Sequence, residues 1–109
     1  MYPTLQINIK MKSISNWQKA LKRAADHRFP KEDWGEMERV RSIQEQLDDV
    51  KAALEVARGT RQSDDHAHQD PDHRIAALIA DIFILAEERG ANIEGELEKV
   101  LAWFEGKNP

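Results

Sequence analysis

Residues 75–90 have the sequence IAALIADIFILAEERG, and this stretch decides the fold class. Its apolar residues recur at helical spacing, at Ile75, Leu78, Ile79, Ile82, Phe83 and Ala86. Small or apolar residues also cover the other side, so Asp81 is the only ionisable residue from Ile75 to Ala86. A helix that is apolar nearly all round has neighbours on several sides. The stretch therefore predicts a central helix that ends at Gly90.

Helical periodicity continues on both sides of this stretch. A first helix is expected to start at Ser13 or Ser15 and to end near Pro30. A long helix is expected from Trp34 to Arg58, with Gly59 as its stop. Asp72 is the expected N-cap of the central helix, and Asn92 that of a last helix. The apolar stripes of the long and last helices are Trp34, Met37, Val40, Ile43, Leu47, Val50, Leu54 and Ala57, and Ile93, Leu97, Val100, Leu101 and Phe104.

Two segments lack helical periodicity. In residues 1–12, Leu5, Ile7, Ile9 and Met11 alternate with polar residues, which predicts an extended N-terminal arm. Residues 60–71 are almost wholly polar and are expected to form an exposed loop. The sequence thus predicts an all-α fold, with one four-helix domain over residues 13–109.

Length and composition bound the function. A helical domain within 109 residues buries a modest core, and partner subunits often supply the rest. We therefore expect a homodimer or dimer of dimers that meets through the helices at 34–58 and 75–90. The net charge of −4 argues against a nucleic-acid polymer as partner. Without cysteines, disulfides and thiolate zinc sites are excluded. No apolar run suggests a membrane span or signal peptide, so the cytoplasm is the expected location.

Carboxylates on the two central helices are the candidate site residues. Glu45 and Asp49 lie one turn apart on the long helix, away from its apolar stripe. Asp81 points away from the main stripe of its own helix, where it must be paired, hydrogen-bonded, metal-bound or at a wet cleft. Carboxylates at this spacing suit a hard divalent cation between facing helices. The alternatives, a solvated acidic face and an Asp81 satisfied by Arg or Lys, remain open at this point.

Residues 43–54, IQEQLDDVKAAL, resemble the metal-binding helix of the MazG-type nucleotide pyrophosphohydrolases, which carries Glu-Glu-x-x-Glu. The order of segments from Trp17 to Lys107 is also similar to that family. Glu45 matches the first acid of the motif and Asp49 the third, whereas the second position is Gln46. The family's Glu-x-x-Asp on the next helix would fall on Arg74 and Ala77. Asp81 follows one turn later, where its partner position would be Leu78.

This resemblance implies a MazG-like bundle completed by oligomerisation and a Mg²⁺ site, with Mn²⁺ as a possible substitute. The ligands it implies are Glu45, Gln46, Asp49 and Asp81. The implied activity is hydrolysis of nucleoside triphosphates to monophosphate and pyrophosphate, so a nucleotide is an expected partner. Catalytic and substrate-binding residues are not assigned. The alternative is a catalytically degenerate helical homo-oligomer that acts as a binding or regulatory module.

Two further features carry weaker signals. The loop DDHAHQDPDH at residues 64–73 contains metal-ligand types, but a flexible loop does not pre-form a coordination geometry and is expected to be solvated. Trp17, Trp34 and Trp103 are each able to stack on a base. Their apolar neighbours at helical spacing favour packing in a core or interface instead.

Overall fold

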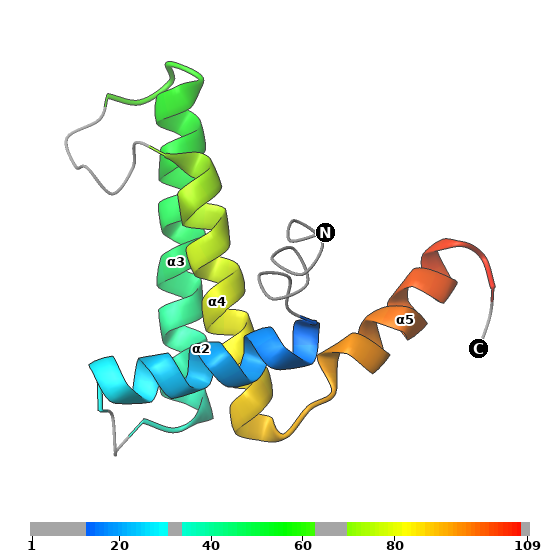
Figure 1. The fold of residues 1–109 in the computed structure, drawn as a ribbon. Helices are drawn as coiled ribbons and strands as arrows, with labels where there is room; N and C mark the ends of the chain where they lie inside the picture. Colours follow the sequence, from blue (N-terminus) through cyan, green and yellow to red (C-terminus); the bar gives the residue numbers. More distant parts are fainter. Residues whose placement is uncertain (1–12, 31–33, 63–69, 108–109) are drawn as a thin grey trace, which may run out of the picture.

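The computed structural model describes residues 13–30, 34–62 and 70–107, and it is helical (Figure 1). Its helices are α2 (Ile14–Arg28), α3 (Glu36–Ala57), α4 (Pro71–Arg89) and α5 (Ile93–Phe104). These four helices, with no strand in the described ranges, confirm the predicted all-α class. The arm expected at residues 1–12 and most of the loop between α3 and α4 lie outside the described residues. No helix in the described ranges is long and apolar enough to span a membrane.

The helix pair α3 and α4 forms the body of the molecule. The two helices lie antiparallel and side by side, and α2 crosses them near the start of α3 and the end of α4 (Figure 1). Helix α4 contacts both α2 and α3, as expected for the central helix. Helix α5 leaves the end of α4 and points away from the helix pair (Figure 1).

Local capping explains where the helices begin. The Ser13 hydroxyl accepts a hydrogen bond from the Asn16 N–H at 3.1 Å, and the Asn92 side chain caps α5. The expected N-cap of α4, Asp72, is wrong: the Asp70 carboxylate accepts from the N–H groups of Asp72 and His73. Pro71 is the reason, because its fixed φ and missing N–H suit the first helical position.

The contact between α3 and α4 is made by small and polar residues. The buried apolar residues are Val50, Ala52, Ala53, Ile84 and Ala86. The predicted main stripe of α4 is not the core of the single chain, because Ile75, Ile79 and Ile82 remain 39–45% exposed. Alanines let the backbones of two helices approach closely, whereas a face of large side chains holds them apart. Val50 and Ile84 are buried, but several other large apolar residues of both helices are therefore left exposed.

Candidate functional site

Asp81 lies in the contact between α3 and α4, where it pairs with an arginine. One Nη of Arg39 donates to Oδ1 of Asp81 at 3.2 Å. The Ser42 hydroxyl donates to the other carboxylate oxygen at 2.6 Å. Arg39 and Asp81 are each only 8% exposed. A buried carboxylate needs a partner of this kind, because desolvation of an unpaired charge is costly. The pairing of Asp81 with Arg or Lys, left open by the sequence, is thus the one observed.

The same arginine joins a longer chain of charges at the α2 crossing. Arg39 also donates to both carboxylate oxygens of Glu88, at 3.5 and 3.3 Å, and its guanidinium lies 4.9 Å from the centre of the Trp34 ring. Lys22 on α2 reaches Glu88 at 3.4 Å and Asp26 at 2.7 Å. The hydrogen bond to Asp26 is the main reason that the pKa of Lys22 is raised, against the effect of burial. These contacts join α2, α3 and α4 electrostatically.

A pocket of about 270 Å³ opens beside this ion pair. It is lined by Ala25, Phe29, Trp34, Arg39, Ser42, Gln46 and Asp81. The Oε1 atom of Gln46 is buried and accepts no hydrogen bond. An unsatisfied buried acceptor carries a free-energy cost that a donor group in the pocket would remove. The pocket therefore offers two aromatic side chains, a guanidinium and acceptor oxygens to a small ligand.

The four residues predicted to bind metal are divided between two places. Gln46 and Asp81 line the pocket together, one from α3 and one from α4. Glu45 is exposed and Asp49 is partly exposed, and neither lines the pocket. Asp49 accepts from an Nη of Arg74 at 3.3 Å.

These positions fit a divalent cation poorly. Asp81 and Asp49 each have an arginine within 3.3 Å, and a guanidinium repels a cation at the oxygens that it occupies. Within residues 13–30, 34–62 and 70–107, no three His, Cys, Asp or Glu side chains are grouped so as to hold a metal ion. The Mg²⁺ site implied by the family resemblance thus stays a prediction.

Sequence reasoning missed Arg39 as a site residue. Arg39, Ser42 and Gln46 are spaced three and four residues apart, so they share one face of α3. That spacing was a usable signal, since the carboxylates of this helix were already expected to face another helix. Phe29 and the pairing of Trp34 with Arg39 had no comparable signal, because they depend on how α2 crosses α3.

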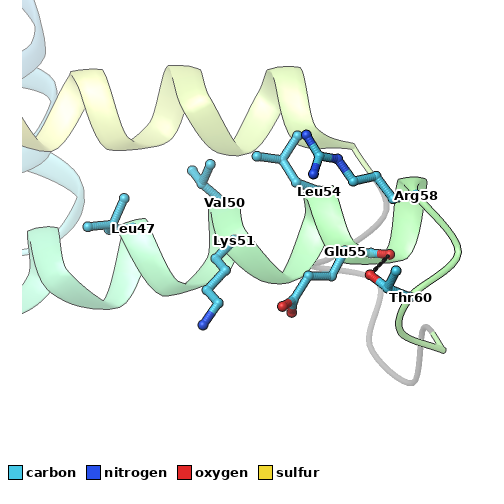
Figure 2. Close-up of a pocket in the computed structure, with 7 residues that line it drawn as sticks. All are labelled: Leu47, Val50, Lys51, Leu54, Glu55, Arg58 and Thr60. Atoms are coloured by element: carbon cyan, nitrogen blue, oxygen red, sulfur yellow. Dashed lines mark hydrogen bonds between the residues drawn. The ribbon is translucent and has the colours of Figure 1, made fainter.

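A second depression, of about 450 Å³, runs along the C-terminal half of α3. Figure 2 shows Leu47, Val50 and Leu54 pointing to the α4 side of it, while Lys51 and Glu55 point the other way. Leu47 and Leu54 remain 55% and 41% exposed. An apolar surface of this kind suits contact with another protein surface better than a polar ligand.

Comparison with family models, curated proteins and solved structures yields no match to this chain.

Proposed function

We propose that the chain is a divergent MazG-like domain that forms a homodimer and binds a nucleotide without depending on Mg²⁺-assisted hydrolysis. The observation that carries this proposal is the pairing of buried Asp81 with Arg39 at 3.2 Å, beside a pocket with aromatic walls. An acid neutralised in this way is suited to hold a binding pocket in shape, and it leaves little charge for a metal ion.

The pocket suits one flat, hydrogen-bonding ring. Its volume of about 270 Å³ is just below the roughly 300–1,000 Å³ of drug-sized ligand sites, so it fits a base rather than a whole nucleotide. Phe29 and Trp34 are able to stack on such a ring. Gln46 Oε1 is an acceptor in need of a donor, such as the amino group of a base. The sugar and phosphates would then extend towards solvent.

The family resemblance gives a consistent account of the lost acids. Arg74, which stands where the resemblance expects a glutamate, donates instead to Asp49. Together with Arg39 at Asp81, this places a fixed positive charge at each of two acids that the resemblance assigns to the metal. A guanidinium supplies charge and directed hydrogen bonds, but it generates no nucleophilic water as a bound metal does. Nucleotide binding without metal-dependent hydrolysis is the expected consequence.

Mg²⁺-dependent pyrophosphohydrolysis is the second candidate. It is favoured by the acids of α3, because Glu45 and Asp49 lie one turn apart on the helix that also carries Gln46, and both have solvent access. Glu38 lies further along the same helix, nearer its N-terminus. These carboxylates would have to bind the cation on the surface of α3, outside the pocket.

The homodimer is supported by the surface that the single chain leaves exposed. The described helices leave large apolar side chains exposed, since Leu47 and Leu54 on α3 and Ile75 and Ile82 on α4 are 39–55% exposed. An interface between two copies would remove this apolar surface from water. Leu47 and Leu54 on α3, with Ile75 and Ile82 on α4, are the residues proposed to meet across the two-fold axis.

Calorimetry with ATP, GTP, CTP and UTP tests the nucleotide proposal, each titrated with EDTA and again with Mn²⁺. We expect binding of at least one nucleotide in EDTA, weakened about tenfold or more by Gln46→Leu, which removes the acceptor. Glu45→Gln, a matched change on the exposed side of α3, should leave the affinity unchanged. Absence of binding to all four nucleotides under both conditions contradicts the proposal.

The same titrations separate the two candidate functions. An enzyme of the second kind would bind Mn²⁺ in the absence of nucleotide, more tightly after Gln46→Glu and more weakly after Asp49→Asn. It would also release pyrophosphate from the bound nucleotide. Equal and negligible Mn²⁺ affinity in all three proteins, with nucleotide binding retained, supports the binding module.

A further inference from the structure

Helix α5 is amphipathic, yet it buries no residue in the single chain. Its apolar face carries Leu97, Val100, Leu101 and Phe104, which are 44–72% exposed. Figure 1 shows the helix projecting from the end of α4, and among the described helices it contacts α2 near its base. An isolated helix of 12 residues is marginal in water without packing of its apolar face. The face therefore needs a surface to cover it.

The turn between α4 and α5 is built so that α5 does not fold back on its own chain. Gly90 has φ 68°, a left-handed conformation that ends α4, and the Ala91 N–H donates back to the Ala86 carbonyl at 2.9 Å. The buried amide of Gln18 on α2 donates to the Ala91 carbonyl at 3.0 Å and to Glu87 at 3.2 Å. The Ser15 N–H donates to Glu94 on α5 at 3.4 Å. These bonds hold the turn and the first residues of α5 against α2 and the end of α4.

An apolar groove of about 380 Å³ lies between α2 and α4 of the same chain. It is lined by Trp17, Leu21, Ala76, Ile79, Ala80 and Phe83. Trp17 and Ile79 are 43% and 45% exposed, so the groove is open. Ala76 and Ala80 give the groove its depth, because their side chains are smaller than those of Ile79 and Phe83 beside them.

The spacing of α5 matches that of the groove. On α5 the apolar residues fall at 97, 100, 101 and 104, and on α4 the lining residues fall at 76, 79, 80 and 83. Both sets have the pattern i, i+3, i+4, i+7, which spans about 10.5 Å of helix. The α5 set is large throughout, whereas the α4 set places alanines at two positions. Large side chains of one helix then fit the hollows of the other, as in packed helical bundles.

We propose that α5 of each copy docks into the α2–α4 groove of a second copy, so that the two helices are exchanged reciprocally. Each copy offers one helix and one groove, and two copies close the arrangement with two-fold symmetry. Charge favours this pairing, because α2 carries four Lys and Arg residues and one acid, while α5 carries three acids and one Lys. The exchange uses residues other than Leu47, Leu54, Ile75 and Ile82, so both contacts fit in one dimer.

This inference rests on the proposed homodimer but has a separate test. The chain contains no cysteine, so an introduced cysteine is the only thiol in each variant and any cross-link can be assigned to it. One protein carries Ala80→Cys in the groove and another carries Leu101→Cys on α5. These positions are central in the two patterns, so they lie close together whichever way α5 runs. The two proteins are mixed, unfolded, refolded together and treated with a short bis-maleimide.

We expect a covalent heterodimer from the mixture and little from either protein alone. Lys99→Cys is the matched control, since it lies on the opposite side of α5, and mixing it with Ala80→Cys should give little product. A chain with both Ala80→Cys and Leu101→Cys that cross-links within itself would show that α5 covers its own groove, and overturns the exchange. A dimer in sedimentation without any cross-link overturns this inference alone and leaves the proposed homodimer standing.

Thiol protection shows what occupies the groove. Maleimide labelling of the Ala80→Cys thiol should be slow, and adding Leu101→Asp should speed it about tenfold or more by dislodging α5. Lys99→Asp, on the other face, should leave the rate unchanged. Fast labelling in every background would show an open groove. Protection that survives Leu101→Asp would show that another segment, such as residues 1–12, covers it. Either result overturns the exchange.

Discussion

The buried and the exposed residues of α3 and α4 differ in kind. The buried residues are three alanines, Val50 and Ile84, together with the ion pair of Arg39 and Asp81, each 8% exposed. Other large apolar residues of the same helices stay in contact with solvent, since Leu47, Ile79 and Ile82 are 40–55% exposed. Amphipathic helices in a monomer usually turn their large apolar residues inward. The intrachain contact thus favours close approach and charge pairing, and it leaves apolar side chains exposed for the contact between copies proposed above.

The two sets of residues should also differ in what they contribute to stability. Burying Arg39 and Asp81 together gives little net stabilisation, because desolvation offsets their attraction. It does fix which residues of α3 and α4 meet, since any other register would leave a buried charge unpaired. The exposed apolar residues carry no such pairing requirement. They would contribute to stability only through the apolar area that a second copy buries.

The largest expected effect comes from removing one partner of the buried pair. Arg39→Met leaves Asp81 buried without its main donor and should lower the free energy of unfolding by about 3–5 kcal/mol. Arg89→Met is the matched control, because Arg89 pairs with Glu36 at 2.8 Å but both side chains are more than half exposed. That surface pair should contribute at most about 1 kcal/mol. The measurement is urea unfolding at one protein concentration. Equal losses in the two variants would contradict the contrast between buried and exposed residues.

A smaller effect is expected from the exposed apolar residues. Leu47→Glu places a charge on the stripe proposed to meet a second copy, and should weaken dimerisation by about 30-fold or more, which corresponds to about 2 kcal/mol. Arg41→Glu is the control, since it adds the same side chain at an exposed position of α3 on another side of the helix. Sedimentation of both variants over a range of concentrations measures the change. If Leu47→Glu remains as dimeric as the control, this stripe is not the interface.

Much of the fold was predictable from sequence because the helices are strongly periodic and well capped. The ends at Ser13, Gly90 and Asn92 follow from local chemistry and are confirmed. The sequence did not predict which face of α4 its own chain covers. Ile75, Ile79 and Ile82 form the more apolar side, but the choice between sides depends on how closely α3 can approach, which only the pair of helices decides.

The candidate site was predictable only in part, for a related physical reason. The isolation of Asp81 in an apolar helix correctly indicated that it needs a partner, and the family resemblance named Gln46, which lines the same pocket. The sequence did not identify Arg39 as the partner of Asp81, because the two residues are 42 positions apart. They meet only when α3 and α4 pair in register. Asp49 was likewise expected beside other acids, yet Arg74 of the facing helix pairs with it.

The smallest expected effect concerns Glu38, an exposed charge that contrasts with the buried Asp81. Glu38 accepts a hydrogen bond from the Gly35 N–H at 2.7 Å, closing the first turn of α3. This bond is the main reason that the pKa of Glu38 is lowered, and its own backbone N–H adds to the effect.

A carboxylate with a lowered pKa stabilises the folded state above its unfolded pKa, and this contribution is lost as the pH falls through the folded pKa. Glu38→Gln keeps an acceptor oxygen but removes the titration. Wild type should therefore have a slightly higher Tm than Glu38→Gln at pH 7, and the difference should shrink as the pH falls below the usual glutamate pKa of about 4.3. Thermal unfolding of both proteins from pH 3 to pH 7 measures it. Because Glu38 is solvated, added salt should shrink the difference, whereas the loss caused by Arg39→Met should change little with salt. A Tm difference that grows as the pH falls would contradict this account of the cap.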